Sequence, residues 1–147
     1  MKWRAKDAEL YLHSKEYIDT AIIPIVSVQL DSNLKSIVTK GEYTSLITEE
    51  LERQLKGRVF LFPSSTYVEK EFSLPFIRKL GDSVNREFRH VVFITTEEEW
   101  KDALEEFQVI TIPHVPLEDL STALKQKMVQ DQIEKILNIL LQYWNGS

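Results

Sequence analysis

The chain has 147 residues and a net charge of −5, with 28% charged and 43% hydrophobic side chains. This length is typical of one domain with a substantial core, so we expect a single domain over residues 1–147. Cysteine is absent, which excludes disulfides, thiolate nucleophiles and zinc fingers and fits a reducing, cytoplasmic compartment. Lysines and arginines are scattered among acidic residues, which disfavours a nucleic-acid partner.

No segment has the pattern of a signal peptide or of a membrane-spanning helix. The first residues are charged and lack an apolar core. The apolar run from Ala21 to Val28 is interrupted by Pro24 and is shorter than the roughly 20 residues that a bilayer requires. A second apolar run, Ile136 to Leu141, contains Asn138 and has the pattern of an amphipathic helix. We therefore expect no membrane insertion.

Four short runs rich in β-branched residues predict strands: Thr20–Val28, Arg58–Phe62, His90–Thr95 and Gln108–Ile112. Helix-patterned stretches separate them, and this alternation is typical of an α/β domain with a mainly parallel sheet. We predict a three-layer fold, Rossmann-like or flavodoxin-like, with a four-stranded sheet in the order 2-1-3-4 and helices on both faces. Pro24 lacks an amide hydrogen, so it predicts an edge position or an irregularity in the first strand.

Apolar residues at helical spacing predict helices over Asp7–Lys15, Glu42–Lys56 and Ser73–Phe88. The polar stretch Gln29–Lys40 predicts a long connecting loop. Gly81 lies inside the third helix and predicts a kink or a close packing contact there.

Thr96 and Glu99 have the spacing of a capping box, which predicts the start of a fourth helix that buries Trp100. A long final helix is predicted from Leu117 to Trp144, with Pro116 well placed to open it. The apolar stripe of this helix is longer than a small sheet, so part of it is expected to extend beyond the sheet.

No familiar catalytic or cofactor motif occurs in the chain. It lacks the glycine-rich phosphate-binding patterns, the G-x-S-x-G turn and the H-E-x-x-H metal motif. The histidines His13, His90 and His114 have no ligand spacing. We therefore predict neither a cofactor nor a metal site, and the motifs leave open whether the protein is an enzyme.

Position in the fold nevertheless indicates candidate ligand-binding residues, because open α/β sheets bind ligands at the carboxyl ends of their strands. Ordinary structural roles are the favoured alternative for each of them: a hydroxyl-rich turn, a helix cap or an exposed histidine. The candidates are Ser64, Ser65, Thr66, Thr95, Thr96 and His114.

A dense apolar group near the end of the final helix is a candidate interaction surface: Ile136, Leu137, Leu140, Leu141 and Trp144. Large bare apolar patches are rare on monomers, so something should cover this group. Burial against the first helix is the simplest expectation, and association with a partner or a second copy is the alternative. The first half of the helix, around Leu120 and Leu124, is expected to pack on the sheet.

The opening of the chain, Met1–Leu12 followed by Glu16–Pro24, resembles the YpiF-like family of Bacillus-type bacteria. Trp3, Asp19-Thr20 and Pro24, with Phe62-Pro63 further on, carry this resemblance. It implies an intracellular bacterial protein. The family has no assigned activity, so the resemblance transfers no functional residue.

Two functions fit these observations. The first is a non-catalytic, regulatory or protein-interaction module, whose partner is another protein or a second copy. It follows from the missing catalytic motifs and the long amphipathic helix. The alternative is a protein or enzyme that binds a small anionic, nucleotide-like ligand at the carboxyl ends of the strands, which rests on analogy with other α/β folds.

Overall fold

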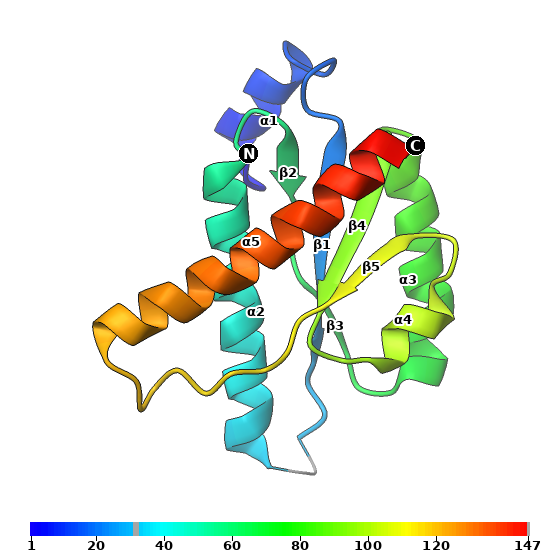
Figure 1. The fold of residues 1–147 in the computed structure, drawn as a ribbon. Helices are drawn as coiled ribbons and strands as arrows, with labels where there is room; N and C mark the ends of the chain where they lie inside the picture. Colours follow the sequence, from blue (N-terminus) through cyan, green and yellow to red (C-terminus); the bar gives the residue numbers. More distant parts are fainter. Residues whose placement is uncertain (31–32, 147) are drawn as a thin grey trace.

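The fold is described from a computed structural model, in which residues 1–30 and 33–146 are described. A parallel sheet forms the middle layer, and helices cover both of its faces (Figure 1). The strands are β1 (Thr20–Ser27), β2 (Val59–Leu61), β3 (Ser65–Tyr67), β4 (His90–Thr95) and β5 (Gln108–Thr111). The helices are α1 (Ala5–Leu12), α2 (Leu34–Gln54), α3 (Lys70–Asn85), α4 (Glu99–Ala103) and α5 (Thr122–Gly146).

The strand order is β2-β1-β4-β5, so the order predicted for the four runs is confirmed. The sheet has a fifth strand, β3, which pairs with the second half of β1. The hydroxyl-rich turn expected as the structural role of Ser64, Ser65 and Thr66 is therefore wrong for Ser65 and Thr66, which lie in β3. A strand of three residues is too short to show an alternating pattern.

Pro24 explains why the edge beside β1 is split into β2 and β3. The Thr20 amide donates to the Arg58 carbonyl, and the Ile22 carbonyl accepts from the Phe62 amide. Since alternate residues of a parallel strand bond to the same neighbour, the Pro24 nitrogen faces this edge and has no hydrogen to donate. The break between β2 and β3 lies at this position. β1 is therefore a central strand, and the irregularity that Pro24 predicts lies in the neighbouring edge, which is split into β2 and β3.

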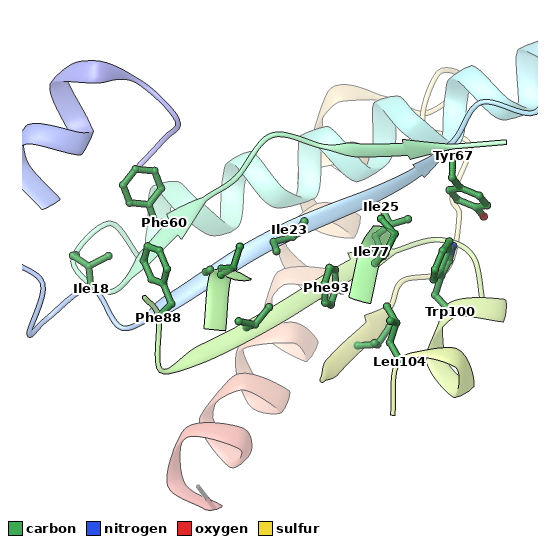
Figure 2. Packing of buried hydrophobic residues seen from close by; sticks show 14 of the residues in the cluster. Ile18, Ile23, Ile25, Phe60, Tyr67, Ile77, Phe88, Phe93, Trp100 and Leu104 are labelled. Carbon is green, nitrogen blue, oxygen red and sulfur yellow. The ribbon is translucent and has the colours of Figure 1, made fainter. Parts of the chain in front are cut away.

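One face of the sheet packs an aromatic-rich core against α1, α3 and α4 (Figure 2). Phe93 and Trp100 lie fully buried in it, and Tyr11 of α1 stacks on Phe88 with ring centroids 5.1 Å apart. Gly81 of α3 admits the ring of Phe107 so closely that a Cβ there would lie 2.5 Å from a ring carbon. The close packing contact predicted at Gly81 is therefore present.

The opposite face packs an aliphatic core against α2 and α5. Ile47 and Leu51 of α2 meet Ile22 and Val92 of the sheet in this core. Ile133 of α5 also lies fully buried here. None of the described helices is long and apolar enough to cross a membrane.

The predicted starts of α2 and α5 are wrong. The expected loop Gln29–Lys40 is mostly helix, because α2 begins at Leu34 and the Asn33 side chain caps it by accepting from the Ser36 amide at 3.3 Å. Residues 31–32 of that stretch lie outside the described part. α5 begins at Thr122 rather than after Pro116, where Ser121 accepts from the Leu124 amide at 3.2 Å.

The predicted capping box at α4 is also wrong. The Thr95 hydroxyl, not that of Thr96, accepts a hydrogen bond from the Glu97 amide at 3.1 Å. α4 begins later, at Glu99, and its first flanking residue Glu98 makes no side-chain cap. Thr95 and Thr96 carry the same side-chain group, so the sequence does not show which of the two accepts this hydrogen bond.

Candidate functional site

The hydroxyl residues predicted at the carboxyl ends of the strands do not converge on one point. Ile25 of β1 pairs with Ser65 of β3 on one side and with Thr95 of β4 on the other. The backbones of Ser65 and Thr95 are therefore about 10 Å apart, twice the spacing of neighbouring strands. Thr95 is buried, and its hydroxyl already serves the Glu97 amide. Ser64 and Thr66 are exposed at the sheet edge.

His114 follows β5 and lies on the α2 side of the sheet. Its ring meets the ring of Tyr43 edge-on, with centroids 6.5 Å apart. The Nε2 atom is buried and has no hydrogen-bond partner among the described residues. Nothing joins His114 to the predicted hydroxyls, so its role as a ligand residue stays a prediction.

Three consecutive glutamates, Glu97 to Glu99, follow β4 at this end of the sheet. The Tyr67 hydroxyl donates to Glu99 Oε2 at 3.1 Å, and burial raises the pKa of Tyr67. Lys40 Nζ lies 3.6 Å from Glu97 Oε1. An anion placed here would meet these carboxylates together with Glu98, so the surface disfavours a phosphate.

Exposed apolar side chains also lie at this end of the sheet, and we call them the carboxyl-end apolar surface: Val28, Val68, Phe72 and Phe76. Phe72 is 82% exposed and Phe76 is 63% exposed. The two phenylalanines stand four residues apart on α3, which places them on one helix face. A hollow of about 460 Å³ connects Val28, Val68 and Phe72. The sequence contains the spacing of the phenylalanines, but only the fold shows that they face outwards.

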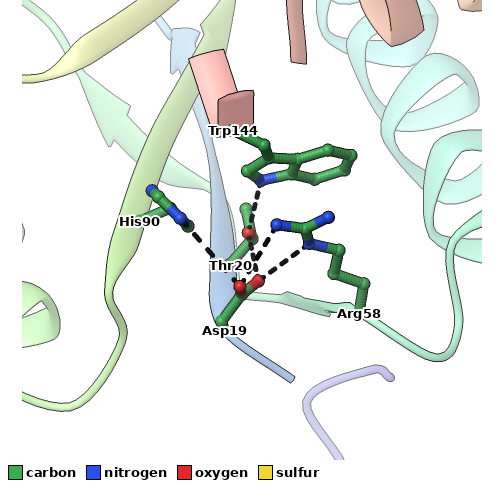
Figure 3. Close-up of polar contacts among 5 residues, drawn as sticks. All are labelled: Asp19, Thr20, Arg58, His90 and Trp144. Carbon is green, nitrogen blue, oxygen red and sulfur yellow. Dashed lines mark hydrogen bonds and ion pairs between the residues drawn. The ribbon is translucent and has the colours of Figure 1, made fainter. Parts of the chain in front are cut away.

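Polar side chains gather at the opposite end of the sheet, where β1, β2 and β4 begin (Figure 3). We call this group the Asp19 cluster: Asp19, Thr20, Arg58, His90 and Trp144. Arg58 donates to both Asp19 oxygens, at 3.1 and 3.3 Å. The Thr20 hydroxyl donates to Asp19 Oδ1 at 2.9 Å and accepts from Trp144 Nε1 at 2.8 Å.

Two rings complete the Asp19 cluster. The Arg58 guanidinium lies 3.8 Å from the centre of the Trp144 ring, a cation–π contact. His90 is buried, with its ring centroid 5.0 Å from that of Tyr143 and Nε2 3.9 Å from Asp19 Oδ2. Burial lowers the pKa of His90, and Arg89 and Arg58 lower it further while Asp19 opposes them.

The Asp19 cluster ties the last turn of α5 to the start of the sheet. Arg58, Thr20 and Trp144 each donate to another member of the cluster. The 3.9 Å separation of His90 Nε2 and Asp19 Oδ2 is too long for a hydrogen bond. Thr20 is the hydroxyl nearest the carboxylate, and it donates its own proton to Asp19. The geometry therefore supports a structural tie rather than acid–base chemistry. Within residues 1–30 and 33–146, no His, Asp and Glu side chains gather as a metal site.

The apolar group predicted as an interaction surface is largely covered by the chain itself. Ile136 and Leu140 are fully buried against the sheet, and Leu137 and Trp144 pack against the same core. Leu141 is 50% exposed. The group is covered by the sheet and not by α1, which packs against the other face, so the expected burial against the first helix is wrong.

The first half of α5 was expected on the sheet, and this too is wrong. Leu124 is exposed, and the orange first half of the helix extends past the sheet beside α2 (Figure 1). Gln54 of α2 donates to Gln130 of α5 at 3.2 Å where the two helices meet. Both halves carry the same stripe, so the pattern could not show which half lies over the strands.

Comparison with known proteins agrees with the resemblance seen in the opening residues. The chain is 45% identical over 148 residues to an uncharacterized protein, YpiF, of Bacillus subtilis strain 168, and the match covers 99% of each chain. No solved structure matches it. The model of a family described as protein of unknown function (DUF2487) matches residues 9–144. The chain therefore belongs to the DUF2487 family.

Proposed function

We propose that this protein is a non-catalytic interaction module that binds another protein through its carboxyl-end apolar surface. The observation that carries the proposal is the exposure of Phe72 and Phe76 on one face of α3. Aromatic side chains dominate the binding energy of protein interfaces, and neighbouring exposed aromatics are uncommon on surfaces that only face water.

Charge around this surface indicates the chemistry of the partner. Glu69, Lys70 and Glu71 directly precede Phe72, with a net charge of −1. Glu98 and Glu99 lie at the start of the neighbouring helix α4. The Tyr67–Glu99 hydrogen bond joins the end of β3 to that helix, which keeps the acids close to the apolar hollow. A partner segment with apolar side chains between lysines or arginines fits this surface best.

The alternative, a small anionic ligand at the carboxyl ends of the strands, has less support. The same acids would repel it, and the Thr95 hydroxyl is already used within the chain. Protein contact is therefore the better interpretation of this end of the sheet.

The test is site-specific photocrosslinking in the native cell. Phe72 is replaced by p-benzoylphenylalanine, and the exposed Tyr17, which lies outside the surface, is replaced in a control protein. We expect position 72 to give a strong adduct, with the crosslink on an apolar, basic segment of another protein. Combined Glu69→Gln and Glu71→Gln changes should weaken that adduct several-fold.

Three results would overturn the proposal. Position 72 could give no more adduct than position 17, which would mean that the surface is unoccupied. The adduct could contain a second copy of the chain, which would mean that the surface mediates self-association and does not bind another protein. The glutamine changes could leave the adduct intact, which would show that basic residues of the partner do not contribute to binding.

A further inference from the structure

A cavity of about 750 Å³ lies between the first residues of the chain and the second half of α2. It is far from the carboxyl-end apolar surface, because α1 and this end of α2 lie where the strands begin (Figure 1). A volume of this size suits a small-molecule ligand. The cavity therefore offers a site independent of the proposed protein contact.

The cavity wall has an excess of positive charge. Arg4 is paired with Asp7 at 3.2 Å, and Arg53 is paired with Glu50. Three further lining cations have no side-chain partner among the described residues: Lys2, Lys6 and Lys56. Of the other two lining acids, Glu52 is paired with the Met1 ammonium and Glu49 remains. Three lysines against Glu49 leave a surplus of two positive charges.

Glu52 supplies the second, independent observation. It lines the cavity yet is only 2% exposed. Its Oε2 atom lies 3.0 Å from the Met1 ammonium, which also donates to the Val59 carbonyl at 2.7 Å. Its Oε1 atom is buried and has no hydrogen-bond partner among the described residues. A buried carboxylate oxygen in this state lacks a donor that a ligand could supply.

We propose that this cavity binds a small phosphorylated compound that also carries an amino or hydroxyl group. The unpaired lysines Lys2, Lys6 and Lys56 hold the phosphate, whose double negative charge matches their surplus. The amino or hydroxyl group donates to Glu52 Oε1. This separates the cavity from a general anion site, because the phosphate alone leaves Glu52 unsatisfied.

The test uses the untagged protein and four probes in titration calorimetry. Phosphoethanolamine and glycerol 3-phosphate carry both groups, ethyl phosphate lacks the donor, and inorganic phosphate is the minimal anion. We expect saturable binding of the first two, at least several-fold tighter than that of ethyl phosphate. Lys6→Gln and Lys56→Gln should each weaken binding about tenfold, whereas Lys79→Gln on α3 is the matched control and should have no effect.

Each contrary result has a defined meaning. If no probe binds saturably at millimolar concentration, the phosphate site is overturned. If Lys6→Gln and Lys56→Gln bind as tightly as the control, the phosphate lies elsewhere and the proposal fails. If ethyl phosphate binds as tightly as phosphoethanolamine, Glu52 receives no donor. Both lysines are exposed, so these variants should fold normally, and circular dichroism checks this.

Discussion

The two ends of the parallel sheet use their side chains in opposite ways. Where the strands begin, the polar members of the Asp19 cluster bond to one another and hold the last turn of α5. Where the strands end, Phe72 and Phe76 face solvent beside a group of acids. The Asp19 cluster bonds within the chain, whereas the carboxyl end leaves apolar surface for another molecule to cover.

We therefore expect the Asp19 cluster to contribute to stability and the carboxyl-end apolar surface to contribute to binding. Ligands of open α/β proteins bind at the carboxyl ends of the strands. The surface that we propose as functional also lies at the carboxyl end, and we propose that it contacts a protein rather than a small ligand. Substitutions at the two ends should therefore have different consequences for stability and for binding.

The largest expected effect is at the buried part of α5. Leu140→Ala removes a fully buried side chain at the end of the sheet that the Asp19 cluster holds. Such a change typically lowers the free energy of unfolding by about 2–5 kcal/mol. Urea denaturation followed by circular dichroism measures it.

The neighbouring Leu141→Ala is the matched control, because Leu141 is half exposed. We expect it to lower the free energy of unfolding by less than about 1 kcal/mol. Equal losses at the two positions would mean that α5 does not lie on the sheet in the orientation described.

The next prediction concerns the hydrogen bond from Trp144 to Thr20. Trp144→Phe keeps a ring for Arg58 to stack on but removes the indole N–H that lies 2.8 Å from the Thr20 hydroxyl. We expect a loss of about 1 kcal/mol in the free energy of unfolding. Thr20→Val removes the partner, and the double variant should lose less than the two single losses together. Strictly additive losses would show that the two side chains do not interact.

The sequence alone predicts the layers and the strand order well, because they follow from long β-branched runs and helical stripes. It predicts the split edge poorly, since β3 has only three residues and the cause, Pro24, lies in the neighbouring strand. The start of α2 depends on one cap at Asn33, inside a stretch whose composition resembles a loop.

The sites were harder to predict than the fold. The Asp19 cluster joins residues as far apart as Thr20 and Trp144, and no local pattern indicates such a contact. The apolar stripe of α5 includes Trp144, although its indole N–H donates to the Thr20 hydroxyl. The sequence does not identify Phe72 and Phe76 as exposed, because two aromatic residues four positions apart on a helix can be either exposed or buried.

A smaller effect is expected from the titration of His90 as the pH falls. Burial lowers the pKa of this group in the folded protein, so the unfolded chain binds the proton more readily. The stability is therefore complete above the unfolded value of about 6.5 and declines as the pH falls below it. One group can contribute a slope of at most about 1.4 kcal/mol per pH unit.

Urea midpoints measured between pH 8 and pH 5 check this prediction. His90→Phe removes the titrating group and should flatten the decline, while His13→Gln changes an exposed histidine and should leave it unchanged. Asp19, Arg58 and Arg89 surround His90 electrostatically and are the same in both variants. A decline that persists fully in His90→Phe would assign the acid sensitivity to other groups.

The smallest stability effect is expected at the carboxyl end of the sheet. Phe72 is exposed, so Phe72→Ser removes few contacts and should change the free energy of unfolding by less than about 0.5 kcal/mol. Phe88→Ser is the buried counterpart, because Phe88 stacks on Tyr11 in the aromatic core, and it should lose several kcal/mol by comparison. Binding should respond in the opposite sense. With the photocrosslinking residue placed at position 76, Phe72→Ser should abolish the adduct with the partner. A Phe72→Ser protein that is strongly destabilised would place this ring in the fold, and the contrast between the two ends of the sheet would then disappear.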